Sequence, residues 1–241
     1  MNFILEVIAF DIESCIIAEK TGAHRIELCD NQAEGGTTPS FGLIHSARKN
    51  TTIELFPIIR PRGGDFLYSE EEFNIMKEDV LLCKKTGCDG VVLGLLNKDG
   101  SIDKKRTSEL VNLAYPMSVT FHRAFDRSNN PFDALEDIIS TGCERILTSG
   151  QYPTALEGIM LIEKLIEMAD DRIIIMPGSD IHSKNIKEIA LKSKAKEFHS
   201  SARTFVKSQM EFHSSKMNDE FKNVQLNEIE VKAMLQELSS I

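Results

Sequence analysis

The chain carries the stretch Thr21-Gly22-Ala23-His24-Arg25-Ile26-Glu27-Leu28, in which an amphipathic segment meets a short apolar run. This order indicates a helix that ends at a left-handed glycine and a buried strand that follows at once. The pattern returns at Thr86-Gly87-Cys88 before Val91-Val92-Leu93, at Thr141-Gly142-Cys143 before Ile146-Leu147-Thr148 and, in degenerate form, at Ser193-Lys194-Ala195 before Phe198-His199. Copies roughly fifty to sixty-five residues apart leave room for two βα units each, so we expect eight strands.

The four intervening strands are expected in runs rich in Ile, Val, Leu and Phe, at residues 2–9, 53–59, 118–121 and 173–176. Strands that alternate with helices call for a parallel sheet. Eight units in 241 residues match the usual length of a closed barrel, so the sequence predicts a (β/α)₈ TIM barrel rather than a doubly wound open sheet. We expect one domain over residues 1–241, with residues 204–241 as a C-terminal extension that packs on the barrel.

Composition narrows the function classes. The formal charge is −9, Trp is absent and no basic stripe occurs, which argues against a nucleic-acid partner. No apolar run approaches membrane-spanning length, so we expect no membrane partner. Five cysteines without a CxxC pair, in a chain without a signal-peptide pattern at its start, favour free thiols in the cytoplasm.

In a (β/α)₈ barrel the functional groups lie at the mouth, the end of the barrel where the strands finish. The repeat places Glu27 and His199 at one position of strands two and eight, on either side of Glu6 on strand one. Two carboxylates and an imidazole together indicate a general acid/base pair or a site for a hard divalent metal. The competing interpretation is a set of ion pairs that hold the barrel closed, formed with Arg25, Arg60 or Arg123.

A second informative stretch is Arg60-Pro61-Arg62-Gly63-Gly64-Asp65, after strand three. Arg60 and Arg62 are two residues apart, so both would point to the same side of a strand. Followed by a Gly-Gly loop, they predict a clamp for a carboxylate or phosphate. The alternative is that one of these arginines neutralises the Glu6 and Glu27 pair.

After strand five, His122 is placed to transfer protons, with Asp126 as an orienting partner, although a lone histidine can equally be a structural group. The sequence therefore predicts Glu27 and His122 as catalytic residues. The predicted substrate-binding residues are Glu6, Arg60, Arg62, Arg123, Ser149 and His199.

These motifs recur together. The chain resembles the copper homeostasis protein CutC family in Ile26-Glu27-Leu28-Cys29, Glu34-Gly35-Gly36-Thr37-Thr38-Pro39-Ser40, Arg60-Pro61-Arg62-Gly63-Gly64-Asp65-Phe66, Thr120-Phe121-His122-Arg123-Ala124-Phe125-Asp126, Leu147-Thr148-Ser149-Gly150 and Glu197-Phe198-His199-Ser200-Ser201-Ala202-Arg203. The resemblance implies a cytosolic, often oligomeric (β/α)₈ barrel that binds copper, and no known reaction.

The chain departs from the family pattern at Ile8, where members commonly carry a cysteine, so Cys29 is the only thiol expected at the mouth. Copper(I) prefers two or more sulfur ligands, and we expect Cys29 to bind it weakly. Two functions therefore stay open. One is a copper-binding homeostasis protein, working as a homo-oligomer, with Cys29 as ligand. The other is an enzyme acting on a small anionic metabolite, with a divalent metal at Glu6, Glu27 and His199. A scaffold without chemistry would leave the charged mouth unexplained.

Overall fold

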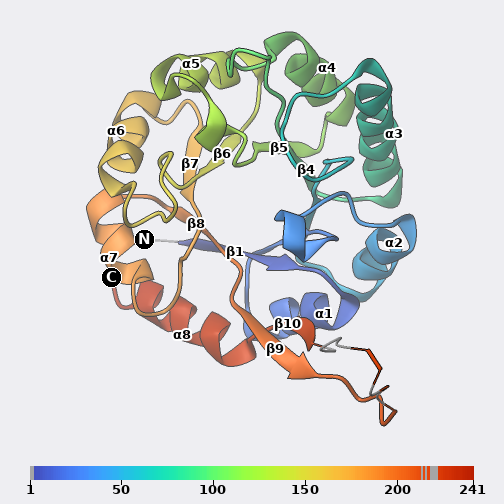
Figure 1. Cartoon of the computed structure of the whole chain (residues 1–241). Coiled ribbons are helices and arrows are strands. Elements are labelled where there is room, and N and C mark those ends of the chain that lie inside the picture. Colours follow the sequence, from blue (N-terminus) through green and yellow to red (C-terminus); the bar gives the residue numbers. More distant parts are fainter. Residues whose placement is uncertain (1–2, 213, 215, 218–221) are drawn as a thin grey trace.

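Strands lie at the centre of the molecule and helices surround them (Figure 1). The computed structural model describes residues 3–212, 214, 216–217 and 222–241. The eight central strands are β1 (Ile4–Ala9), β2 (Arg25–Leu28), β3 (Glu54–Pro57), β4 (Gly90–Leu93), β5 (Ser118–Phe121), β6 (Arg145–Thr148), β7 (Ile174–Pro177) and β8 (Glu197–Ser200).

Helices alternate with these strands along the chain. The α-helices are α1 (Ile12–Thr21), α2 (Phe41–Asn50), α3 (Glu70–Thr86), α4 (Lys104–Ala114), α5 (Pro131–Thr141), α6 (Ile159–Ala169), α7 (Ile186–Ser193) and α8 (Glu228–Ser239). Two short 3₁₀ helices, η1 (Gln32–Glu34) and η2 (Phe125–Arg127), lie in loops that follow β2 and β5.

The strands pair in parallel, in the orders β3-β2-β1-β8 and β4-β5-β6-β7. A parallel bridge between Ile58 and Val92 joins the β3 side of the first group to β4. On the opposite side β7 lies beside β8, which completes the ring (Figure 1). The (β/α)₈ barrel predicted from the repeat is therefore confirmed.

The repeated turns have the predicted conformation. Gly22, Gly87 and Gly142 follow α1, α3 and α5 with φ of 85°, 81° and 88°, the left-handed region that side chains disfavour. In the degenerate copy Lys194 takes this role with φ of 63°. Each turn sends the chain directly into an even-numbered strand.

The same turns also bind the start of the preceding odd-numbered strand. The residue two places after each glycine accepts a backbone N–H through its side chain. These bonds join His24 Nδ1 to Leu5 N (3.1 Å), Asp89 Oδ2 to Leu55 N (2.9 Å) and Glu144 Oε2 to Val119 N (2.7 Å). The repeat thus fixes neighbouring strands in register at the N-terminal end of the barrel.

The C-terminal segment forms a hairpin and a helix. Strands β9 (Arg203–Lys207) and β10 (Lys222–Leu226) pair antiparallel and project from the barrel (Figure 1). Helix α8 then lies between α1 and α7, and Leu226 N donates to Ser14 Oγ of α1 at 3.1 Å. Residues 204–241, treated above as an extension, thus include the eighth helix of the barrel.

Side-chain alternation along the strands separates the apolar core from the barrel interior. On β1, Leu5, Val7 and Ala9 pack in the large apolar cluster shared with the helices. Glu6 and Ile8 lie between them in sequence and face the opposite way, into the barrel.

Within the described part of the chain, no helix combines the length and apolar character needed to cross a membrane.

Candidate functional site

A cavity of about 250 Å³ opens at the C-terminal end of the strands. Its walls are apolar at Ile8, Ile58, Phe66 and Leu147. Five of the predicted site residues line it: Glu27, Arg60, His122, Arg123 and His199. Glu6, Cys29, Arg62 and Ser149 are not part of the lining.

At the floor of the mouth His199 lies between two buried carboxylates. Its Nδ1 is 2.7 Å from Glu6 Oε1, and its Nε2 is 3.6 Å from Glu27 Oε2. Strand register produces this arrangement, because the β1–β8 ladder pairs Glu6 with His199 and the β1–β2 ladder pairs Ile8 with Glu27. The sequence predicted this cluster because Glu27 and His199 occupy equivalent positions in the repeat.

Burial and charge set the protonation of the cluster. Burial raises the pKa of Glu27 to about 7, helped by the charge of Glu6 and partly offset by His199. Burial would also raise the pKa of Glu6, but the hydrogen bond and charge of His199, together with Arg25 and Arg145, lower it. For His199, burial is outweighed by the two carboxylates, which raise its pKa. These shifts favour the ionised form of Glu6 and the charged form of His199, beside a Glu27 carboxyl whose pKa of about 7 suits proton exchange near neutrality.

Ligand atoms of Glu6, Glu27 and His199 all lie within 4.8 Å of one another, close enough to share a metal ion. Because Glu6 already contacts Nδ1 of His199, the atoms left to bind a metal directly are the Glu27 carboxylate and Nε2, which must first release its proton. Glu6 would then orient the imidazole, as carboxylates often do behind metal-bound histidines. Oxygen and imidazole donors suit divalent ions better than copper(I).

Arg60 is buried at the cavity wall and is held by backbone carbonyls. Its Nη1 donates to Glu34 O at 2.6 Å and Gly36 O at 2.7 Å, and its Nη2 donates to Gly64 O at 2.9 Å. It forms no ion pair with a carboxylate among the described residues. Its positive charge therefore faces the cavity without a protein counter-ion.

Arg62 lies elsewhere. Its Nε donates to Glu72 at 2.5 Å and its Nη2 to Asp65 at 3.0 Å. Strand β3 ends at Pro57 and the chain bends from Pro61 onward, so the parity that linked the two arginines does not continue. Arg60 and Arg62 thus do not converge on one ligand.

Arg123 and Ser149 meet at Asp126. The Asp126 carboxylate accepts from Arg123 Nε at 2.7 Å and from Ser149 Oγ at 2.9 Å, and Arg123 Nη2 donates to Ser149 Oγ at 2.7 Å. The 3₁₀ turn η2 carries Asp126 back to Arg123, so it pairs there and not with His122, which was the sequence expectation. Ser149 fixes Arg123 at the rim.

Cys29 lies fully buried among Phe56, Ile58 and Val92. Burial raises the pKa of its thiol well above the ordinary value, and the charges of Glu27 and Glu6 raise it further. The group is therefore a protonated thiol in apolar surroundings, a weaker metal donor than a thiolate.

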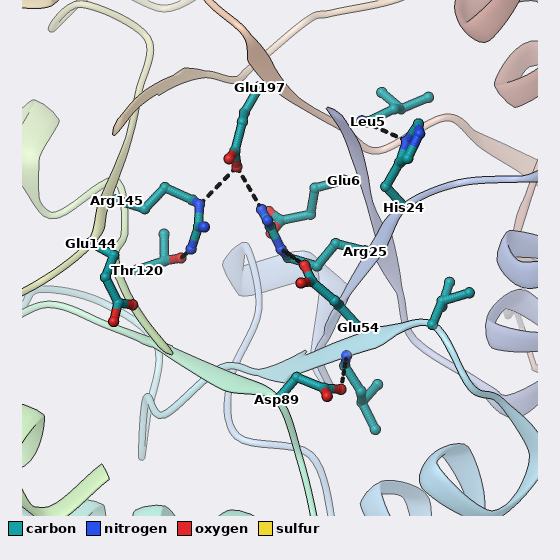
Figure 2. A network of polar contacts seen from close by, with 12 residues as sticks. Leu5, Glu6, His24, Arg25, Glu54, Asp89, Thr120, Glu144, Arg145 and Glu197 are labelled. Atoms are coloured by element: carbon teal, nitrogen blue, oxygen red, sulfur yellow. Dashed lines mark hydrogen bonds and ion pairs between the residues drawn. The ribbon is translucent and has the colours of Figure 1, made fainter. Parts of the chain in front are cut away.

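Beneath the cluster a buried ion network crosses the barrel (Figure 2). Arg25 donates to Glu197 at 2.8 Å and to Glu54 at 2.8 Å, and it lies 3.4 Å from Glu6. Arg145 donates to the same oxygen of Glu197 at 2.7 Å. The ion-pair interpretation of Glu6 thus holds for Arg25, while Glu27 has His199 as its charged neighbour.

The sequence analysis missed this network, because it examined strand ends and not strand starts. A signal was present in the repeat. Arg25, Arg145 and Glu197 occupy one position of three copies, the first residue of an even-numbered strand, and Gly90 takes it in the fourth. Charges at a position that faces the barrel interior must pair with one another.

The chain is similar to known proteins over most of its length. Residues 3–204 match the model of the CutC family. The chain belongs to the CutC family. A family protein CutC from Chromobacterium violaceum is 52% identical over 88% of this chain and 86% of its own length. A copper homeostasis protein cutC homolog of Homo sapiens is 48% identical over 89% of this chain and 78% of its own.

The crystal structure of a putative copper homeostasis protein CutC from Streptococcus agalactiae has a TM-score of 0.79 and 32% identity, covering 83% of this chain and 98% of that one. Ile8 occupies the position where the resemblance described above led us to expect a cysteine in family members. In the structure Ile8 packs against the cluster around Cys29. Among the described residues the group around Cys29 is therefore hydrocarbon: Phe56, Ile58 and Val92, with Ile8 and Phe10 packed against them.

Proposed function

We propose that this protein acts in copper homeostasis, the role stated in the names of its human and mouse relatives, and that its mouth binds the copper ion. The observation that carries the proposal is the buried group of Glu6, Glu27 and His199, with ligand atoms within 4.8 Å of one another. These donors suit copper(II), which binds nitrogen and oxygen ligands more tightly than other divalent first-row ions. Cys29 is the donor for copper(I), and we expect that binding to be weak.

Competition titrations with a calibrated chelator test the two oxidation states separately. We expect Glu27→Gln and His199→Gln each to weaken copper(II) binding at least about tenfold, as loss of a ligand does. Cys29→Ser should leave copper(II) binding unchanged and remove the weak copper(I) binding. His45→Gln, on the exposed surface of α2, is the matched control for adventitious histidine binding. Copper(II) binding that survives both mouth variants would contradict this site, as would tight copper(I) binding in Cys29→Ser.

A second candidate function is enzymatic. The specific observation is a buried carboxyl, Glu27, whose pKa of about 7 suits general acid/base work and which faces a cavity. The substrate would be a small anionic metabolite that contacts Arg60 and Arg123, with His122 as the further catalytic residue. Glu6 and His199 would position the acid/base group. Arg62 and Ser149 would act by holding the loops that carry Arg60 and Arg123.

Proton exchange with solvent tests the enzymatic candidate without knowledge of the full reaction. Small anionic metabolites are incubated with the protein in D₂O, and deuterium uptake at carbon is followed by NMR. We expect uptake with the wild-type protein and loss of uptake with Glu27→Gln, which keeps shape and removes the exchangeable acid. Uptake that persists in this variant would exclude Glu27 as the base.

We also propose that the protein works in the cytoplasm as a homo-oligomer. The five buried free cysteines support a reducing compartment. The hairpin segment supports association, because Phe205, Met210 and Phe212 are 63%, 56% and 75% exposed. Light scattering should give a mass above that of one chain, and Phe205→Ser with Phe212→Ser should lower it. A monomeric wild-type protein would contradict the proposal.

A further inference from the structure

Two buried N–H groups at the cavity wall have no hydrogen-bond partner in the described structure. They are Nε of Arg60 and Nε2 of His122, on side chains that are 5% and 4% exposed as residues. Both residues line the same cavity. Buried polar groups are nearly always paired, so two unpaired groups on one wall point to a ligand that supplies the acceptor.

The hydrogen bonds of His122 determine which of its nitrogens can donate. Its Nδ1 accepts from the backbone N–H of Ala124 at 3.1 Å. A neutral ring bonded in this way carries its proton on Nε2. Burial, and then the charge of Arg60, lower the pKa of His122 to about 3, so the ring stays neutral at physiological pH. Nε2 is therefore a fixed donor and cannot bind a metal without losing its proton.

Arg60 offers one further donor, Nε–H, which shares its buried surroundings with the Tyr68 hydroxyl. Three backbone carbonyls accept hydrogen bonds from its terminal nitrogens, as described above, whereas Nε–H has no acceptor among the described residues. The guanidinium keeps its charge without a carboxylate partner in the described part of the chain. An anion at this wall would gain both the hydrogen bond and the charge.

Phe66 packs against both donor residues. Its ring centroid is 5.0 Å from that of the His122 imidazole and 5.1 Å from the guanidinium carbon of Arg60. The ring follows the Gly63-Gly64 pair, where Gly64 has φ of 79°. Phe66 thus covers the wall, on a loop whose backbone can change direction at glycine.

We propose that this cavity binds a small monocarboxylate, whose oxygens accept from Nε2–H of His122 and Nε–H of Arg60 once the Phe66 ring turns aside. The inference rests on the second candidate function and names the substrate class for it. Two single donors match the two oxygens of one carboxylate. Asp180 in the lining disfavours a doubly charged phosphate, and a cavity of about 250 Å³ admits only a compact molecule.

The test compares pyruvate, lactate, acetate and inorganic phosphate as probes in calorimetric titrations, with ¹⁵N-histidine NMR to follow Nε2 of His122. The matched variants are His122→Asn and His122→Gln. Asn Oδ1 takes the place of Nδ1 as acceptor for Ala124 N but removes the Nε2 donor, whereas Gln retains a donor near Nε2. Thermal unfolding of both variants verifies the fold.

We expect at least one monocarboxylate to bind the wild-type protein, to bind roughly tenfold more tightly than phosphate and to shift the His122 Nε2–H signal. His122→Asn should weaken this binding roughly tenfold, and His122→Gln should weaken it less. Binding that is unchanged in His122→Asn, tighter binding of phosphate, or no binding of any monocarboxylate would overturn the inference. Deuterium uptake tests the enzymatic function separately. Deuterium uptake together with unchanged carboxylate binding by His122→Asn would contradict only the proposed binding site. Carboxylate binding without deuterium uptake would contradict only the enzymatic function.

Discussion

Arg25 and Arg145 donate to a single carboxylate oxygen, Oε2 of Glu197, over 2.8 and 2.7 Å. Both arginines stand at the first position of their strands, and both are almost fully buried. Figure 2 shows their guanidinium groups converging on Glu197 from opposite sides of the barrel. This ion network lies under the mouth and supports Glu6, which in turn contacts His199.

Arg25→Met is expected to destabilise the protein by about 3–5 kcal/mol, because it leaves Glu6 and Glu197 buried with less compensating charge. Urea unfolding followed by circular dichroism measures the change. Lys164→Met, which removes an exposed pair with Glu167, is the control and should have no measurable effect. An Arg25→Met protein as stable as the control would show that water reaches the network.

Glu27→Gln should stabilise the protein at alkaline pH. The folded state raises the pKa of Glu27 from 4.5 to about 7, so the folded chain keeps a proton that the unfolded chain has released. Stability therefore falls as pH rises through this window, and the full penalty is present above it. Removing the carboxyl should add on the order of 3 kcal/mol near pH 8 and much less near pH 5.

Glu6→Gln is the matched contrast and should have the opposite sign. Its pKa is lowered in the folded state, so the ionised carboxylate stabilises the protein above its unfolded pKa and this contribution is lost in acid. Unfolding curves for both variants across the pH range separate the two roles. Loss of stability in both variants at about pH 8 would make Glu27 a structural ion-pair partner of His199.

The thiols should be inert in the folded protein. All five cysteines are buried, and burial raises the pKa of Cys15 and Cys143 to about 12. A chromogenic disulfide reagent should therefore react with none of them in native buffer and with five after unfolding in guanidinium. Fast labelling of Cys29 in the native state would instead indicate an accessible thiolate and would strengthen the copper(I) site.

Gly94→Ala should disturb the cavity without changing any charge. A methyl group at this position would lie 2.5 Å from Nδ1 of His122 and 3.0 Å from the Ala124 side chain, so the imidazole must shift. We expect a loss of about 1–3 kcal/mol, typical of overpacking. Gly42→Ala on α2, where an added methyl group would meet only Ser40 Oγ at 3.9 Å, is the control and should be neutral or stabilising. Equal stability of the two variants would mean that the His122 ring moves freely.

The sequence predicted the barrel and the Glu6, Glu27 and His199 cluster for one reason. Strand alternation is regular, so equal positions in the repeat point the same way. Strand alternation could not predict where side chains beyond the ends of the strands would point. Arg62 lies in a bend and Asp126 in a 3₁₀ turn, where no fixed period relates position in the sequence to the direction of the side chain. The role of Arg60 depends on carbonyls from three loop residues, which no side-chain pattern encodes.

The position of Glu197 on the last strand bears on how the chain assembles during synthesis. Arg145 has no other carboxylate partner among the described residues, and Glu197 is made 52 residues later. In a nascent chain that ends before β8, only the more distant charge of Glu6 would compensate Arg145 in the interior. We therefore expect early closure of a seven-stranded ring to be unfavourable and the final strand, which carries Glu197, to complete the interior of the barrel.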